Sequence, residues 1–329
     1  MKIRLYSDKI FSDGETENHV FKTYVKEEGY EEKTVMLDHP DAKGSFREIY
    51  FDHFRIGIGD LQLAQKAVLD FESEEKMVEM YFSLEAEINI RSDSFEEDMN
   101  FSSHEQNIIF MGEIEGCLEC GAGKFRIVEV DVDPTFFMKY APESGWIYEK
   151  FLDKIKTGTS GPLARKNGLI DLEMHRIIQD ILTCSRKGMY KTMFLESKII
   201  ELFLLQLEQL DEQLDSPLTI KSDDIDKLYL VRDFILENLA GSYSLVELAR
   251  IAGTNEFALK KGFKELFGTT VFGFWNDAKM DRAHKLLKDS DKTIKEIASL
   301  VGYKYPQHFT AAFKRKFGIV PSHMRYRQS

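Results

Sequence analysis

One helix-stop-turn pattern occurs twice in the last third of this chain, and it constrains the fold more than any other feature. Segment 244–253, Ser-Leu-Val-Glu-Leu-Ala-Arg-Ile-Ala-Gly, is matched about 50 residues later by 293–302, Thr-Ile-Lys-Glu-Ile-Ala-Ser-Leu-Val-Gly. In both copies a hydroxyl residue precedes apolar positions at helical spacing, and a glycine ends the helix where φ can turn positive. A second short helix is expected after each copy, over 256–267 and 306–317. The sequence therefore predicts two helix-turn-helix units in tandem.

Two such units are typical of DNA binding, because a short second helix presented at an angle fits the major groove. From about Asp226 to Arg327 the chain resembles the paired helix-turn-helix domain of the AraC family of bacterial transcription regulators. The residues that carry the resemblance are Arg282-Ala283, Leu286-Leu287, Gly302-Tyr303, His308-Phe309, Ala312-Phe313-Lys314, Phe317-Gly318 and Pro321-Ser322. Segments 195–202, 259–264 and 268–273 resemble the branch related to the pyochelin-responsive regulator.

This resemblance implies a ligand-responsive transcription regulator rather than an enzyme. The implied partners are double-stranded DNA, a small-molecule effector, a second copy of the chain in a homodimer, and RNA polymerase. The implied role is activation of iron, siderophore or small-metabolite genes, and no cofactor is expected.

Charge is divided unevenly along the 329 residues. Residues 221–329 contain 19 Lys and Arg against 13 Asp and Glu, whereas residues 1–220 contain 25 against 43. A surface that faces phosphates needs only a local excess of positive charge, and this excess lies in the segment that carries the repeated motif. The net charge of −12 therefore does not argue against DNA binding.

No stretch approaches the roughly 20 consecutive apolar residues of a membrane span, and the first residues lack a signal-peptide pattern. Three cysteines are too few for a disulfide framework, so we expect a cytoplasmic protein without a membrane partner. Cys117 and Cys120 form a single CxxC, which leaves two alternatives: a redox or metal sensor, and an alkyl-transfer repair enzyme fused to a DNA-binding domain. No histidine at ligand spacing and no recognisable activating group accompany the pair, so we expect no metal site and no catalytic residue.

The predicted fold class is α+β, with strands over about 1–133 and helices over about 134–214, followed by an all-α tandem helix-turn-helix domain. In 77–90 apolar residues occupy every second position, which predicts a half-buried strand or a bent pair of strands. Further strands are expected at 54–63, 66–71, 106–111 and 125–132, and helices at 135–140, 144–155 and 171–185. Short strands at this spacing predict a small antiparallel barrel or sandwich, and the resemblance implies a cupin-like effector barrel.

We expect an effector-binding and dimerisation domain over 1–215, a linker over 216–225 and the DNA-binding domain over 226–329. The longest predicted helix, about 189–214, carries two apolar stripes. The stripe with heptad spacing consists of Met193, Ile200, Phe203, Leu207, Leu210 and Leu214. Because AraC relatives dimerise through a helix in this position, we predict that this stripe is a dimer seam. Periodicity alone equally allows both stripes to belong to the domain's own core.

The second helix of the first unit has one predicted buried face, with Leu259, Phe263 and Leu266, and one predicted DNA face. Matching the family's recognition helix places Phe257, Lys260 and Lys261 toward bases and Lys264 toward the phosphate backbone. A lysine can donate to guanine, and an aromatic group can contact the thymine methyl. The alternative is that these lysines form an ordinary solvated helix face.

The corresponding helix of the second unit is predicted to bury Phe309, Phe313 and Phe317. Its exposed positions are predicted to face bases with Gln307, His308 and Ala311, and phosphates with Lys314 and Arg315. Many AraC relatives have arginine where Ala311 stands, so we expect weaker base recognition by this helix and more phosphate anchoring.

The effector pocket is the least constrained site. Met80, Phe82, Phe110 and Trp146 are candidates, because apolar ligand pockets are lined by such side chains. The alternative is that all four residues are plain core.

Overall fold

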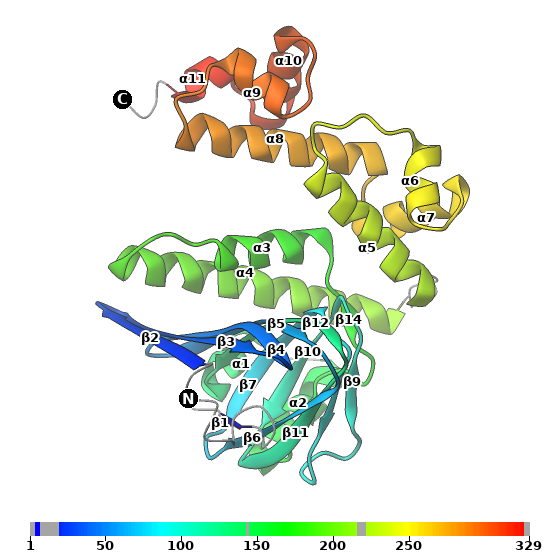
Figure 1. Cartoon of the computed structure of the whole chain (residues 1–329). Coiled ribbons are helices and arrows are strands. Elements are labelled where there is room, and N and C mark those ends of the chain that lie inside the picture. Colours follow the sequence, from blue (N-terminus) through cyan, green and yellow to red (C-terminus); the bar gives the residue numbers. More distant parts are fainter. Residues whose placement is uncertain (1–3, 7–19, 143–144, 216–221, 326–329) are drawn as a thin grey trace. The chain divides into compact units, whose positions relative to one another are not determined.

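The structure, a computed structural model, describes residues 4–6, 20–142, 145–215 and 222–325. The chain divides into two compact units, Met1–Pro217 and Leu218–Ser329, and each is described by itself (Figure 1). The first unit contains strands followed by helices, and the second contains helices only among its described residues. This confirms the α+β class predicted from the sequence.

The strands of the first unit form two antiparallel sheets. The larger sheet has the order β13-β10-β7-β12-β5-β4-β3-β2, and β14 pairs with β10. Its strands are β2 (Val20–Glu27), β3 (Tyr30–His39), β4 (Ala42–Tyr50), β5 (Phe54–Leu63), β7 (Met77–Glu85), β10 (Glu105–Met111), β12 (Gly123–Val132), β13 (Gly161–Pro162) and β14 (Gly168–Leu169). The smaller sheet, in the order β1-β6-β11-β8-β9, contains β1 (Arg4–Tyr6), β6 (Ala67–Ser73), β11 (Ile114–Cys120), β8 (Ile88–Arg91) and β9 (Met99–Phe101).

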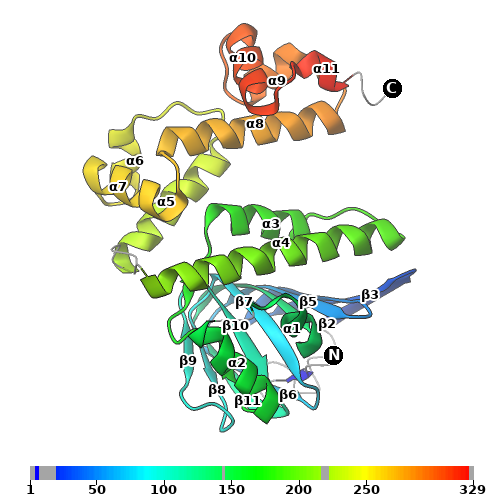
Figure 2. The same cartoon turned by 180° about the vertical axis from the view of Figure 1, so that it is seen from behind.

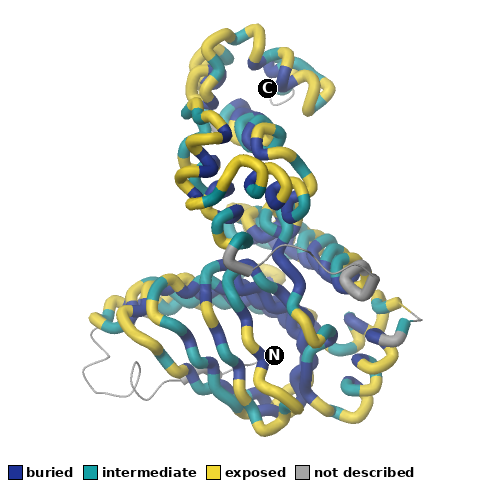
Figure 3. Tube along the Cα trace, turned by 90° about the vertical axis from the view of Figure 1, so that its right-hand side faces the viewer, coloured by how far each residue is buried: buried dark blue, intermediate teal, exposed yellow. Residues whose placement is uncertain are grey.

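The two sheets enclose a shared apolar core. Phe71 and Leu118 from the small sheet pack in one cluster with Met111, Phe125 and Ile127 from the large sheet. Among the described residues no backbone ladder joins the sheets, so the expected barrel has the form of a two-sheet sandwich. The central strands β7, β10 and β12 contain unbroken runs of buried residues, and buried stretches are dark blue in Figure 3.

The segment 77–90 bends into two strands, β7 and β8, which belong to different sheets. Every residue of β7 is buried except Glu85 at its end. Val78 and Met80 pack in the cluster that contains the helices, whereas Tyr81 packs in the cluster between the sheets. The prediction that this strand is half-buried is therefore wrong for β7, because the small sheet covers the face that carries its polar residues.

The described residues of the first unit also form four helices, which lie along one face of the large sheet (Figure 2). They are α1 (Pro134–Tyr140), α2 (Trp146–Thr157), α3 (Leu172–Leu182) and α4 (Gly188–Asp215). Asp133 caps α1 by accepting a hydrogen bond from the backbone N–H of Thr135, and Asp171 caps α3 in the same way through Met174. None of the helices in the described ranges is long and apolar enough to span a bilayer.

The heptad stripe of α4 does not form a single exposed seam. Phe203, Leu207 and Leu210 are buried in the domain's own core, where the Phe203 ring contacts that of Phe137 at 5.6 Å between centroids. Met193 is 62% exposed. Ile200 is half-buried, and the side chain of Leu214 lies outside the described residues. The seam prediction is wrong for the three core residues, because the α1–α2 segment and the sheet cover that side of α4.

The second unit contains seven helices in its described part. They are α5 (Ser222–Glu237), α6 (Leu245–Ile251), α7 (Glu256–Phe267), α8 (Val271–Asp289), α9 (Ile294–Leu300), α10 (Pro306–Phe317) and α11 (Pro321–Arg325). Residues 216–221 of the expected linker lie outside the described residues. Because α5 begins at Ser222, residues 222–225, which we assigned to the linker, are helical instead.

Candidate DNA interface and the polar interior of the first unit

The two helix-turn-helix units are built by the same local devices. Ser244 and Thr293 each form a complete capping box with the glutamate three residues later, so α6 and α9 begin at fixed positions. Gly253 and Gly302 follow these helices with φ of 63° and 82°, a region that glycine enters without steric cost. The helices end where the sequence predicted, and the following helices can leave at an angle.

The helix α7 presents one buried and one exposed face. Asn255 caps it by accepting a hydrogen bond of 2.9 Å from the N–H of Ala258. The predicted buried residues Leu259, Phe263 and Leu266 are buried, and the predicted contact residues are exposed: Phe257, Lys260, Lys261 and Lys264. In the described part of the chain none of these three lysines forms an ion pair. Phe257 is 77% exposed, so most of its ring is available for contact with a partner.

The helix α10 repeats this division. Phe309 and Phe313 are fully buried, whereas Phe317 is only half-buried and stacks on His284 at 5.2 Å between ring centroids. The predicted contact residues are all exposed: Gln307, His308, Ala311, Lys314 and Arg315. The neighbouring Lys316, which we had not singled out, pairs instead with Asp277 and Asp281 of α8.

The long helix α8 packs against both helix-turn-helix units. Its Trp275 donates a hydrogen bond of 3.0 Å from Nε1 to the carbonyl of Leu239, just before the first helix-turn-helix unit. Asn276, one residue further, accepts a bond of 2.7 Å from the hydroxyl of Tyr303 in the second helix-turn-helix unit. Met280 and Ala283 join the core of α9 and α10. Both recognition helices are therefore supported by one rigid element.

A second polar constellation lies inside the first unit, on the face of the large sheet that meets the small sheet. Arg55 of β5 lies opposite Asp131 of β12, and Asp131 lies opposite Glu79 of β7. The Arg55 guanidinium donates from Nε to Asp131 Oδ2 at 2.5 Å and from Nη2 to Glu129 Oε2 at 3.1 Å. Its third hydrogen bond, from Nη1 to Glu48 Oε1, is also 3.1 Å.

Burial dominates the electrostatics of this cluster. Loss of solvation raises the pKa of Glu79 well above its usual range, and the neighbouring Glu129 and Asp131 raise it further. Burial also raises the pKa of Glu129 to about 7, although Arg55 opposes the shift. Gly57 makes room for this carboxyl group, since a Cβ there would lie 2.9 Å from Glu129 Oε1. No role for these acids is predicted from the sequence. Glu129 and Asp131 alternate with Val128, Val130 and Val132, a pattern that is also typical of a strand with one solvent-facing side.

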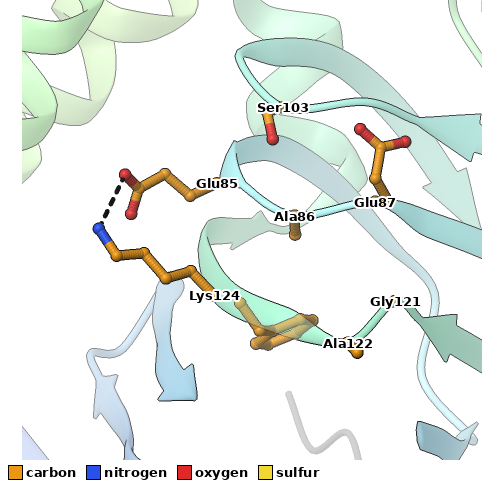
Figure 4. A pocket seen from close by; sticks show the side chains of 8 residues that line it. Glu85, Ala86, Glu87, Ser103, Gly121, Ala122 and Lys124 are labelled. Atoms are coloured by element: carbon orange, nitrogen blue, oxygen red, sulfur yellow. Dashed lines mark hydrogen bonds and ion pairs between the residues drawn. The ribbon is translucent and has the colours of Figure 1, made fainter. Parts of the chain in front are cut away.

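Two hollows lie near this interior. One, of about 30 Å³, lies between the sheets and is lined by Phe71, Glu79, Tyr81, Ile90, Met111, Leu118, Ile127 and Glu129. The other, of about 270 Å³, lies at the rim of the sandwich and is lined by Glu85, Ala86, Glu87, Ser103, Gly121, Ala122, Lys124 and Phe125. Figure 4 shows the ion pair between Lys124 Nζ and Glu85 Oε1, 3.4 Å apart, on one side of this rim pocket.

The effector-pocket residues predicted from the sequence do not line either hollow. Met80, Phe82 and Phe110 are fully buried in the core under the helices, which is the alternative we had left open. Trp146 begins α2, and its side chain lies outside the described residues. The prediction is wrong for the first three, because even-numbered residues of β7 and β10 face the helices and odd-numbered residues face the sandwich interior.

The CxxC does not bring its two thiols together. Cys117 and Cys120 lie three residues apart on β11, so their side chains point to opposite faces of the strand. Cys120 is buried, and burial raises the pKa of its thiol to about 12, which disfavours the reactive thiolate. This geometry does not favour a shared metal ion or an intramolecular disulfide at the motif.

Family comparisons match both parts of the chain. Residues 43–220 match the family described as Regulatory protein PchR N-terminal domain, which is more than half of the chain. Residues 248–327 match the family described as Helix-turn-helix domain.

Individual relatives are transcription regulators. The Regulatory protein PchR of Pseudomonas aeruginosa is 31% identical over 124 residues, 37% of this chain and 42% of the relative. The Bifunctional transcriptional activator/DNA repair enzyme AdaA of Bacillus subtilis is 28% identical over 109 residues, 33% of this chain and 52% of the relative. The chain thus matches about half or less of these curated relatives. A solved structure of a ToxT variant from Vibrio cholerae is 13% identical with a TM-score of 0.35, and the match covers 83% of this chain and 97% of that one.

Proposed function

The chain belongs to the PchR-related branch of the AraC family of transcription regulators, and from that premise we propose that it is a ligand-responsive transcription activator. The second unit binds double-stranded DNA, and the first unit binds a small-molecule effector. The protein acts in the cytoplasm as a homodimer that contacts RNA polymerase. Its effector belongs to iron, siderophore or small-metabolite chemistry.

The observation that carries this proposal is the exposed face of α7. A helix that buries Leu259 and Phe263 leaves Phe257 in solvent, together with several lysines that form no ion pair with the residues described. Folding of the unit does not require that arrangement, whereas the major groove offers acceptors for the lysines and thymine methyl groups for the ring. We propose that Phe257, Lys260 and Lys261 contact bases and that Lys264 contacts a phosphate.

The second recognition helix has a different role in this proposal. Ala311 is exposed at the position where a long side chain would reach a base, so Gln307 and His308 carry what base recognition there is. Lys314 and Arg315, which form no ion pair in the described part of the chain, anchor the phosphate backbone. Each subunit then binds a continuous asymmetric site, with sharper sequence preference under α7 than under α10.

For the effector we propose the rim pocket. Its volume of about 270 Å³ suits a small molecule, and Glu85, Glu87, Ser103 and Lys124 offer it both charges and a hydroxyl. In this proposal the rim pocket takes the place of the apolar residues that were predicted from the sequence to bind the effector.

The test uses the full-length protein and a selected DNA site in a fluorescence anisotropy titration. Lys260→Ala or Lys261→Ala should each lose roughly 1 to 3 kcal/mol of binding on that site. Lys166→Ala, which removes an exposed lysine from the first unit, is the matched control and should bind like the parent protein. Equal losses from all three variants, or none, would reject the assigned interface.

The enzyme alternative is best tested by mass spectrometry after incubation with methylated DNA. The AdaA match raises it, but the chain's buried Cys120 and the separation of the two thiols on β11 do not favour alkyl transfer. A stable methyl adduct on Cys117 or Cys120 would revive it.

A further inference from the structure

The buried carboxylates of the first unit serve neither DNA binding nor the rim pocket. Glu79, Glu129 and Asp131 each offer an oxygen, and these oxygens lie within 4.8 Å of one another. The exposed fractions are 2% for Glu79, 8% for Glu129 and 0% for Asp131. Three acids so close together and so deeply buried require compensation.

The protein supplies only part of that compensation. Arg55 contributes one positive charge and contacts one oxygen of Asp131 and one of Glu129. Its third contact is Glu48, whose side chain is 27% exposed and therefore reaches solvent. With all three buried acids ionised, the interior cluster of Arg55, Glu79, Glu129 and Asp131 carries two uncompensated negative charges.

A second observation points to a ligand at the same place. The Tyr81 hydroxyl is buried, lines the 30 Å³ hollow beside Glu79 and Glu129, and has no hydrogen-bond partner among the described residues. Asp131 Oδ1, the oxygen that Arg55 does not contact, also has none. Buried polar groups left without partners are rare in folded proteins and indicate an ion or water that belongs there.

The size and chemistry of the hollow select the ligand. A space of about 30 Å³ holds an ion and a water molecule or two, but not a metabolite. Carboxylate oxygens without imidazole or thiolate partners prefer hard cations such as Mg²⁺, Mn²⁺ and Ca²⁺.

We propose that the interior of the first unit binds one hard divalent cation through Glu79, Glu129 and Asp131, with Tyr81 hydrogen-bonded to a water on the ion. Its two positive charges neutralise the excess that Arg55 leaves. This site is separate from the rim pocket and from the DNA interface.

The test measures Mn²⁺ bound to the full-length protein. The chain is unfolded in denaturant with EDTA, refolded with or without Mn²⁺, and desalted into about 0.15 M salt, which screens weak surface binding. We expect about one Mn²⁺ per chain by atomic emission, and a higher unfolding temperature with the ion than without it.

Glu79→Gln removes a ligand without changing the size of the side chain and should lower bound Mn²⁺ to background. Glu113→Gln changes an exposed turn residue in the same way and should bind like the parent chain. If Glu79→Gln fails to refold, Tyr81→Phe replaces it and should weaken Mn²⁺ binding measurably. Parent protein that retains no Mn²⁺ after refolding with the ion, or a Glu79→Gln variant that binds Mn²⁺ as tightly as the parent, overturns the proposal. In either case a bound proton neutralises the cluster.

Discussion

The strand β7 and the helix α7 carry the same kind of sequence pattern but end in opposite environments. Each alternates apolar with polar residues at the period of its own secondary structure. In α7 the polar face is exposed, and Lys260 and Lys261 lie in solvent. In β7 the polar face is buried beneath a second sheet, so that Glu79 and Tyr81 lie in the interior. Periodicity therefore shows which residues share a face, and tertiary packing decides whether that face meets water.

The largest expected effect separates the core stripe of α4 from its exposed end. Leu207→Glu should lower the free energy of unfolding by roughly 4 kcal/mol or more, because it places a carboxylate in the apolar core. Met193→Glu, on the same helix but at an exposed position, should change it by less than about 0.5 kcal/mol. Urea unfolding measures both variants, and a stable, folded monomer from Leu207→Glu would restore the dimer seam.

A second comparison is between a buried and an exposed arginine of the first unit. Arg55→Met should cost about 3 to 5 kcal/mol, because it leaves Glu129 and Asp131 without their guanidinium partner. Arg176→Met, which breaks an exposed pair with Glu173, should cost no more than about 1 kcal/mol. Similar urea midpoints for the two variants would show that the interior cluster is not buried as described.

The pH dependence of stability should test the raised pKa of the buried Glu129. The folded-state pKa of Glu129 is about 7, above the ordinary 4.5, so its contribution to stability is present at low pH and is lost as pH rises through 7. Relative to Glu129→Gln, the parent protein in EDTA should lose on the order of 2 kcal/mol between about pH 5 and pH 8. Parallel stability curves for the two proteins over this range would contradict the raised pKa.

On the exposed side, removal of a charge should affect DNA binding rather than folding. Arg315→Ala should weaken binding to all sequences about equally and reduce the slope of log affinity against log salt by about 0.9. Lys261→Ala should instead relax preference at one base pair. Binding-site selection at two salt concentrations distinguishes the two results. If Arg315→Ala lost affinity only for particular sequences, Arg315 rather than Lys261 would be the residue that contacts a base.

The smallest expected effect concerns Phe257. Phe257→Ala should leave the free energy of unfolding within about 0.5 kcal/mol of the parent value, because the ring contributes little to the core. Its affinity for the selected DNA site should nevertheless fall. A large loss of stability would mean that the ring packs within the protein and is not available for DNA.

Much of the second unit could be predicted because its signals are local. The hydroxyl caps Ser244 and Thr293, the glutamates three residues later and the glycines that end each helix act within one or two turns. The buried residues Leu259 and Phe263 follow from helical spacing alone. The cap of α7 also depends on one local hydrogen bond, which Asn255 accepts from the backbone N–H three residues later.

The first unit resisted prediction because its decisive contacts join residues far apart in the sequence. Arg55 contacts Asp131 only after β5 and β12 have paired, and no local sequence pattern near either residue predicts that contact. The burial of Leu207 depends on Phe137 and Tyr148, which belong to the same core cluster. The Tyr148 hydroxyl donates a hydrogen bond to the Leu207 carbonyl, about 60 residues away in the sequence.

The sequence by itself determined the two helix-turn-helix units, the strand-rich first part and the sides of each helix that share a face, because capping, glycine conformation and side-chain period are short-range properties. Only the tertiary structure decided that the polar side of β7 is interior, that Phe203, Leu207 and Leu210 are core, and that Met80, Phe82 and Phe110 are packed under the helices rather than lining either of the two hollows. The physical reason is that burial is a property of two surfaces together, and the sequence of one surface does not specify what covers it.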